Sequence, residues 1–213
     1  MSRPRVLLAD DHRIMAEGLR ALLEPEFEPV GVVGDGRELV AAAGRLRPDV
    51  IVADVTMPGL NGIEAAAQLR RAGVAAKVVF LTMHRDVAYA RRALEAGAAG
   101  FVLKHSAPAE LLTAIREALD GKTYLTPAIA GELVRSYRDD DPGRAGAARR
   151  LTPRQREVLQ LVAEGRSAKE VAALLHVSVR TAEFHRGRVL RALGLRTTAE
   201  LVQYAIRNGI TPA

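Results

Sequence analysis

The first 120 residues alternate five short apolar runs with five amphipathic stretches, and this alternation limits the folds that the chain can adopt. It predicts a parallel sheet with helices on both faces, because each connection between parallel strands crosses over through a helix. Right-handed crossovers favour a doubly wound α/β fold with the flavodoxin-like strand order 2-1-3-4-5. The expected strands are residues 5–9, 29–33, 50–53, 77–82 and 100–103, and the expected helices lie near 13–24, 36–46, 61–72, 86–96 and 108–120.

The last third of the chain has a different pattern. The stretch RDDDPGRAGAARR (138–150) combines charged, small and turn-forming residues without apolar periodicity, which is typical of a flexible linker. All later periods are helical. We therefore predict a first domain at 1–122, a partly helical linker at 123–148 and a small all-α domain at 149–213. The helices expected in that last domain are residues 153–164, 168–175, 179–193 and 198–208.

The formal net charge of +6 is unevenly distributed along the chain. Residues 149–213 contain 12 Lys and Arg residues, five Glu and no Asp, so this segment carries +7 and the preceding residues carry −1. Such an excess suggests a polyanionic partner for the last third. On charge alone, a solvated basic surface explains the excess equally well.

The chain contains no cysteine, which excludes disulfides and thiolate metal sites and fits a reducing cytoplasm. Its N-terminus reaches acidic residues after a very short apolar stretch, so we expect no signal peptide. No apolar run is long enough to span a membrane. These features predict a cytoplasmic protein without a membrane partner.

Polar side chains follow several of the expected strands. Asp10 and Asp11 follow the first strand, Asp54 follows the third, Thr82 ends the fourth and Lys104 follows the fifth. The carboxyl ends of parallel strands share one edge, and the gap between strands 1 and 3 is the topological switch point where ligands bind. Converging carboxylates need a cation, and oxygen ligands suit Mg²⁺, a good partner of phosphates. Taken singly, Asp10 or Asp11 is an ordinary helix N-cap. Together, the placements predict that Asp54 accepts a phosphoryl group.

Four segments, LLADDH, VIVADVTMPGLNGIE, VVFLT and GFVLK, resemble the receiver domain of bacterial two-component response regulators. The resemblance covers about residues 4–120 and implies that Asp54 is the phosphoacceptor. It also implies that Asp11, Asp54 and the Thr56 carbonyl bind Mg²⁺ directly, and that Asp10 helps through water. In the same family pattern, Arg13 stands where relatives often have proline.

The resemblance also assigns roles beyond the metal ligands. It implies that Lys104 pairs with the phosphoryl group and that Thr82 and Phe101 form a switch. A sensor histidine kinase is the implied phosphoryl donor.

The expected helix at 179–193 divides into two faces. At 100° per residue, Ala182, Val189 and Leu193 form a stripe that should face the core, and Ser178 is a plausible N-cap. The opposite face is the kind that a helix-turn-helix protein inserts into the major groove, although an ordinary amphipathic helix in a bundle has the same division. The predicted DNA contacts are Lys169, Arg180, Thr181, Glu183, Phe184, Gly187, Arg188 and Arg191.

The segment from Leu151 to Ile210 resembles the LuxR-type helix-turn-helix domain, notably in LTPRQREVLQLVAEG, KEVA, VSVRTAEFH and LRALGLRTTAELVQYAIRNG. Relatives usually have lysine at the place of Glu183 and often a basic residue at Gly187. The two halves together resemble receiver-plus-LuxR transcription regulators of the NarL and FixJ kind. The resemblance implies operator DNA as a partner and a homodimer when phosphorylated or on DNA. Apolar positions of the last helix either form that dimer contact or pack internally: Leu201, Val202, Ala205 and Ile206.

The expected function is a DNA-binding transcription regulator, not an enzyme, that is controlled by phosphorylation of Asp54. One alternative is a constitutive DNA-binding protein whose receiver serves only as a dimerisation module. Another is a phosphohydrolase that uses Asp54 as a transient nucleophile and would need a nearby general acid. Thr56 occupies the place of the aspartate that such an enzyme usually has two residues beyond its nucleophile, which disfavours this alternative.

Overall fold

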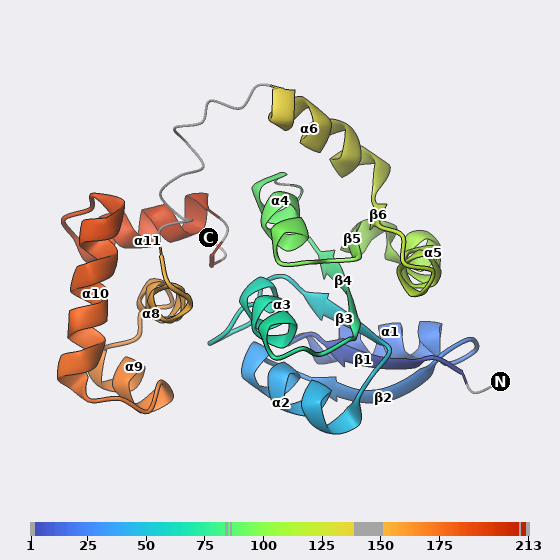
Figure 1. Ribbon diagram of the computed structural model, residues 1–213, viewed down its shortest axis with the longest axis horizontal. Helices are drawn as coiled ribbons and strands as arrows, with labels where there is room; N and C mark the ends of the chain where they lie inside the picture. Colours follow the sequence, from blue (N-terminus) through green and yellow to red (C-terminus); the bar gives the residue numbers. More distant parts are fainter. Residues whose placement is uncertain (1–2, 84, 86, 139–150, 209, 212–213) are drawn as a thin grey trace. The chain divides into compact units, whose positions relative to one another are not determined.

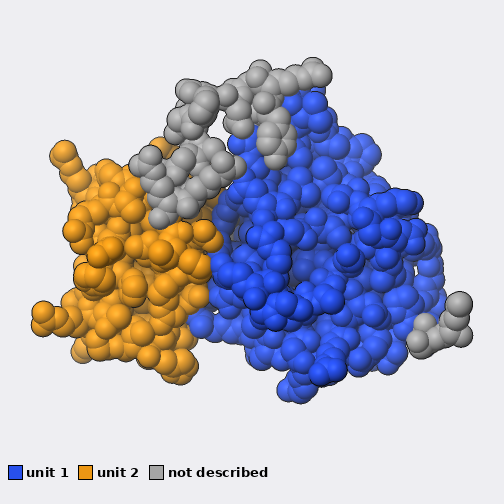
Figure 2. Space-filling model, viewed as in Figure 1, with its two compact units in different colours: residues 1–136 blue, residues 137–213 orange. Residues whose placement is uncertain are grey.

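The computed structural model describes residues 3–83, 85, 87–138, 151–208 and 210–211. The chain divides into two compact units, Met1–Ser136 and Tyr137–Ala213 (Figure 2). This division falls inside helix α6 (Pro127–Arg138), so the expected boundaries after residues 122 and 148 stay predictions. Nearly all of the expected linker stretch 138–150 lies outside the described residues. Within the described part of the chain, no helix is both long and apolar enough to cross a membrane.

The first unit is built on a parallel sheet with the strand order β2-β1-β3-β4-β5-β6 (Figure 1). The predicted order 2-1-3-4-5 is confirmed, and β6 adds a short strand beside β5. The sequence does not predict β6, because two residues are too few to show an alternating pattern. The strands are β1 (Arg5–Ala9), β2 (Glu28–Val33), β3 (Val50–Asp54), β4 (Lys77–Thr82), β5 (Gly100–Leu103) and β6 (Tyr124–Leu125).

Helices cover both faces of this sheet, as a doubly wound fold requires. One core cluster joins alternate strand residues to α2, α3 and α4, and a second cluster joins the other strand residues to α1 and α5 (Figure 1). Strand residues that are buried on both faces explain why the sequence shows continuous apolar runs instead of alternation. The helices are α1 (Arg13–Leu23), α2 (Gly36–Leu46), α3 (Gly62–Arg71), α4 (Val87–Glu95), α5 (Ala107–Leu119) and α6, with a short 3-10 helix η1 (Lys104–Ser106) after β5.

The loop after β3 packs closely against the strand that carries Asp54. A Cβ added at Gly62 would lie 2.1 Å from the backbone oxygen of Asp54, so any larger residue would displace the strand end. Asn61 caps α3, because its side chain accepts a hydrogen bond of 2.9 Å from the Glu64 backbone N–H. Val55 and Leu60 are buried within the same loop. These contacts hold the end of β3 in a defined position at the sheet edge.

The second unit is a small helical domain around one apolar cluster. Side-chain caps begin each of its helices, and Thr152 and Ser167 form reciprocal capping boxes with Gln155 and Glu170. The expected N-cap Ser178 is confirmed, since its hydroxyl accepts a hydrogen bond of 3.1 Å from the Thr181 N–H. The predicted helices are confirmed within one residue at each end. They are α8 (Pro153–Ala163), α9 (Ala168–Leu174), α10 (Val179–Leu193) and α11 (Thr198–Arg207).

Candidate functional site: an acidic pocket and a basic helix face

Two carboxylates meet at the edge of the sheet where β1 and β3 end. Asp10 follows β1 and Asp54 is the last residue of β3, and the two strands pair directly with Ala9 opposite Ala53. Asp10 is only 5% exposed and Asp54 only 4%. Two carboxylates that are shielded from water in this way destabilise the fold unless cations or hydrogen bonds compensate their charge.

Lys104 supplies one compensating charge. Its Nζ lies 2.7 Å from Asp10 Oδ2 and 2.7 Å from Asp54 Oδ2, and its side chain is 4% exposed. Lys104 reaches this point because β5 ends at Leu103 and the chain turns into η1. Each carboxylate also accepts a local backbone hydrogen bond: His12 N–H donates to Asp10 over 2.9 Å and Thr56 N–H donates to Asp54 over 3.2 Å.

The ionisation of this trio follows from burial and charge. Burial raises the pKa of the Asp54 carboxyl, the Lys104 ammonium opposes that rise, and the Asp10 carboxylate adds to it. Burial works against the charge of Lys104, but the attraction of Asp54 and the hydrogen bonds to both carboxylates outweigh it and raise the pKa of Lys104. Lys104 therefore stays protonated at neutral pH. One ammonium faces two carboxylates, which leaves the buried trio with an excess of negative charge that favours a further cation.

The raised pKa of Asp54 gives a testable consequence for stability. A folded chain that holds this proton more tightly than the unfolded chain loses stability as the pH rises through the folded-state pKa. Asp54→Asn removes the charge, so this variant is expected to show a higher urea midpoint than the wild type at pH 7 in metal-free buffer. The gain should shrink as the pH falls toward 3.8, the ordinary value of the carboxyl pKa. A variant that is less stable than the wild type at pH 7 would contradict this account.

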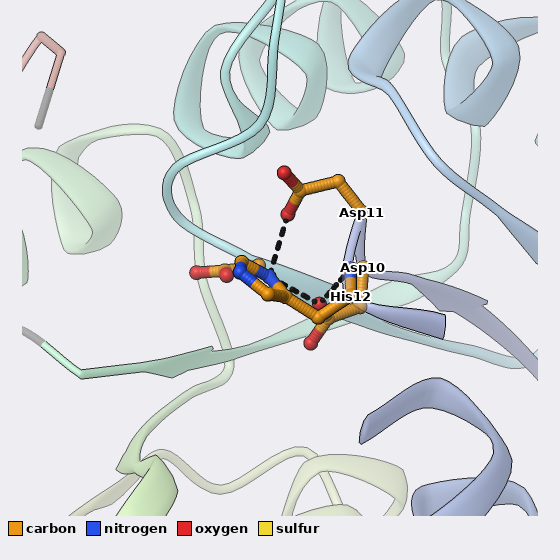
Figure 3. A group of neighbouring side chains, drawn as sticks. Asp10, Asp11 and His12 are labelled. Carbon is orange, nitrogen blue, oxygen red and sulfur yellow. Dashed lines mark hydrogen bonds and ion pairs between the residues drawn. The ribbon is translucent and has the colours of Figure 1, made fainter. Parts of the chain in front are cut away.

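Asp11 and His12 lie beside Asp10 (Figure 3), and both are exposed to solvent. The His12 Nδ1 atom lies 3.0 Å from Asp11 Oδ1 and 3.3 Å from Asp10 Oδ1. Asp10, Asp11, His12 and Asp54 each offer one ligand atom, and these atoms lie within 4.8 Å of one another. Three carboxylate oxygens are the hard donors that Mg²⁺ prefers, so these residues fit that ion. The sequence prediction did not include His12, although its position directly after Asp10 and Asp11 could have identified it.

The remaining predicted receiver residues lie on β4, β5 and the loop after β3. Thr82 ends β4, is fully buried and pairs with Leu103 across the strands. Phe101 is also fully buried and pairs with Phe80. The roles of Thr82 and Phe101 in a switch, and of the Thr56 carbonyl as a metal ligand, stay predictions.

Thr126 connects this edge of the sheet to α6 and was not identified from the sequence. Its buried hydroxyl accepts a hydrogen bond of 3.2 Å from the Leu103 N–H and donates one of 2.6 Å to Glu110 Oε2 on α5. Its backbone N–H donates to the Phe101 carbonyl over 3.0 Å. The start of α6 is therefore hydrogen-bonded to the strand that precedes Lys104.

The predicted DNA contacts lie on α9 and along one face of α10. The buried residues of α10 are Ala182 and Val189, and Leu193 packs against the same cluster while remaining half-buried. At 100° per residue, most of the predicted contacts of α10 occupy the side opposite Ala182 and Val189, and Thr181 and Glu183 lie on its two flanks. Thr181 and Gly187 are half-buried, and the exposed members of the set are Lys169, Arg180, Glu183, Phe184, Arg188 and Arg191.

Two further arginines lie beside this face and were not part of the prediction. Arg166 and Arg186 line a small pocket between α8, α9 and α10 together with Glu183. Arg166 precedes the capping box of α9, and Arg186 lies on α10 next to the predicted face. Their positive charge was visible in the sequence, but only the packing of the three helices brings them to one pocket.

Two family descriptions match the chain over these two regions. Residues 6–116 match "Response regulator receiver domain", and residues 149–205 match "Bacterial regulatory proteins, luxR family". The chain is a two-component response regulator. It combines a receiver domain, which carries the acidic pocket of Asp10, Asp11 and Asp54, with a DNA-binding domain of the LuxR type. Its family consists of transcription regulators and not of enzymes.

Similar proteins cover between 65% and 97% of this response regulator. The "Transcriptional regulatory protein MctR" of Rhizobium johnstonii is 36% identical over 210 residues, which are 97% of this chain and 94% of the relative. A crystal structure of a LuxR-family response regulator from Aurantimonas covers 65% of this chain and 100% of its own, with 40% identity and a TM-score of 0.62. A structure of two RcsB dimers bound to two parallel DNAs covers 95% of this chain and 98% of that chain, with 28% identity and a TM-score of 0.60.

Proposed function

We propose that this response regulator accepts a phosphoryl group on Asp54 from a sensor histidine kinase and thereby changes its binding to operator DNA. The observation that carries the proposal is the Lys104 ammonium, which lies 2.7 Å from the carboxylates of both Asp10 and Asp54 at the end of β3. An Asp54 carboxylate oxygen attacks the phosphorus, the bond to the donor nitrogen breaks, and the donor imidazole leaves. Lys104 is in reach of the transferred phosphoryl oxygens and balances their charge.

Mg²⁺ is the proposed cofactor. Asp11, Asp54 and the Thr56 carbonyl would hold it directly, and Asp10 would hold it through water. The bound ion would neutralise charge on the phosphoryl oxygens. The cluster of ligand atoms within 4.8 Å supports this assignment. We also propose that the protein is located in the cytoplasm.

The metal assignment predicts that Mg²⁺ stabilises the Asp11→Ala variant less than it stabilises the wild type. Mg²⁺ at 100 times its dissociation constant should stabilise the wild-type protein by about 2.7 kcal/mol, because the ion binds only the folded state. Asp11→Ala removes a hard oxygen ligand whose side chain is 35% exposed, so its own folding should change little in metal-free buffer. Urea unfolding with and without Mg²⁺ measures both quantities. An equal Mg²⁺ response in the two proteins would remove Asp11 from the proposed ligand set.

We propose that Thr82 and Phe101 transmit the phosphorylated state to the rest of the receiver. Phosphoryl charge at Asp54 would draw the Thr82 hydroxyl toward it and let Phe101 reorient, which biases a two-state element. The hydrogen bond from the Thr126 backbone N–H to the Phe101 carbonyl supports a path toward α6, since α6 begins at residue 127 and leads toward the second unit along the chain.

The proposed DNA interface is the exposed face of α10 with Lys169 on α9. Its supports are the +7 charge of residues 149–213 and the geometry of a helix-turn-helix whose second helix has a polar outer face. A homodimer on DNA is proposed as well, because the RcsB structure contains dimers bound to DNA. On α11, Leu201 and Ala205 are fully buried, which leaves the half-buried Val202 and the exposed Ile206 as candidates for a dimer contact.

The test compares the full-length protein with and without a small phosphodonor and Mg²⁺. Phosphorylation is expected to raise the sedimenting mass, because the proposed homodimer forms. It should also tighten operator binding, because the second DNA-binding domain of the dimer is then held at a high local concentration near the DNA. In the Asp54→Asn variant, the phosphodonor should change neither the operator affinity nor the sedimenting mass. Identical affinity and identical mass in the two states would favour the constitutive DNA-binding protein with a receiver that only dimerises.

A further inference from the structure

On the outer face of α10, an aromatic side chain and an arginine side chain contact each other. The Arg188 guanidinium carbon lies over the Phe184 ring, 5.1 Å from its centroid, and Phe184 remains 53% exposed. About half of the Phe184 surface is therefore accessible to a partner on the outer face of α10. The ring of His185 lies 5.9 Å from the Phe184 ring in an edge-on arrangement, which further restricts where the phenyl ring can point.

We infer that Phe184 and Arg188 act as one base-recognition unit, in which Phe184 contacts the methyl group of a thymine and holds Arg188 against a nearby guanine. This inference rests on the proposed insertion of α10 into the major groove. In that groove, apolar side chains contact the thymine C5-methyl group, and arginine binds guanine O6 and N7 in a bidentate manner. A guanidinium that is held over an aromatic ring loses less conformational freedom when it binds a base than one on a free side chain.

The spacing of the two residues limits the DNA step that they can contact. Phe184 and Arg188 are one helical turn apart, which is about 6 Å along the helix axis. Successive base pairs rise by about 3.4 Å, so the thymine and the guanine should lie one or two base steps apart. The inferred unit places Arg188 at a base edge and not at a phosphate alone. It leaves the other cations of the face to contact the backbone.

The experiment begins with the full-length wild-type protein and a pool of duplexes that contain a randomised stretch. Selection is expected to enrich sequences with a thymine one or two steps from a guanine. In the selected duplex, thymine is then replaced by uracil, which removes only the methyl group, and guanine is replaced by 7-deazaguanine, which removes only the N7 acceptor. The wild type should lose about fourfold in affinity for the uracil duplex, the effect of one buried methyl-sized group. It should lose about fivefold or more for the 7-deazaguanine duplex.

The variants decide whether the two residues act together. Phe184→Ala should bind the thymine and uracil duplexes with equal affinity. When guanine is replaced by 7-deazaguanine, this variant should lose less affinity than the wild type does. Arg188→Ala should bind the guanine and 7-deazaguanine duplexes equally. Two control variants should lose as much affinity as the wild type for both modified duplexes. They are Leu174→Ala, which changes an exposed apolar residue of α9, and Arg207→Ala, which changes an exposed arginine of α11.

Each other result overturns the inference in a recognisable way. A wild type that does not distinguish uracil from thymine would remove Phe184 from base recognition. An undiminished 7-deazaguanine loss in Phe184→Ala would show two independent contacts, and the same loss in Arg188→Ala would show that Arg188 does not bind guanine N7. Failure of the wild type to bind any duplex would overturn the proposed DNA-binding face itself, and the recognition unit with it.

Discussion

Asp54→Asn is expected to abolish incorporation of the phosphoryl group when the protein is incubated with a small phosphodonor and Mg²⁺. Asparagine keeps the shape of the aspartate but has no carboxylate oxygen to attack phosphorus. The Thr56 N–H donates to Asp54 Oδ1, and the amide oxygen of asparagine can accept the same bond. The loss of phosphorylation should therefore be complete while the receiver stays folded.

Intact mass spectrometry measures this loss directly, and circular dichroism checks that the variant is folded. Asp120→Asn is the matched control, because the Asp120 side chain is 68% exposed at the end of α5 and pairs loosely with Lys122, over 3.9 Å. This control should acquire one phosphoryl group, as the wild type does. Undiminished phosphorylation of Asp54→Asn would mean that another residue is the acceptor.

The second large effect is expected in the salt dependence of DNA binding. Lys169, Arg180 and Arg191 are the exposed cations of the proposed face, if Arg188 contacts a base. Three phosphate contacts per domain give a slope of about −2.7 in a plot of log affinity against log salt. Affinity should then fall by about 40-fold per domain between 50 and 200 mM salt, and by about 10³-fold for a dimer.

Titrations of a labelled duplex at several salt concentrations provide the slope. Lys169→Ala should weaken binding to all sequences alike and make the slope shallower by about 0.9 per domain, because one counterion fewer is released. Arg207→Ala, which removes an exposed cation of α11, should leave the slope unchanged. A slope near zero for the wild type would exclude phosphate contacts as the source of affinity.

The sequence determined the fold of the receiver to a large extent. Parallel strands buried on both faces produce continuous apolar runs, and the helical connections between them restrict the strand order to a few arrangements. For the same reason, Asp10, Asp54 and Lys104 could be expected near one another, since residues that follow parallel strands meet at one sheet edge. The side-chain N-caps of the second unit were equally accessible, because Ser178 acts on a backbone N–H only three residues away.

The folded structure decided how these residues meet. Lys104 binds both Asp10 and Asp54 at 2.7 Å because of the precise place where β5 ends and η1 begins, and no spacing in the sequence encodes that position. Strand β6 and the buried Thr126 hydroxyl depend on β5 as a template, since two residues cannot form a strand alone. The i, i+4 spacing of Phe184 and Arg188 permits a contact, but side-chain rotamers place the guanidinium over the ring. Local patterns specify which residues share a face, whereas distances between side chains follow from packing.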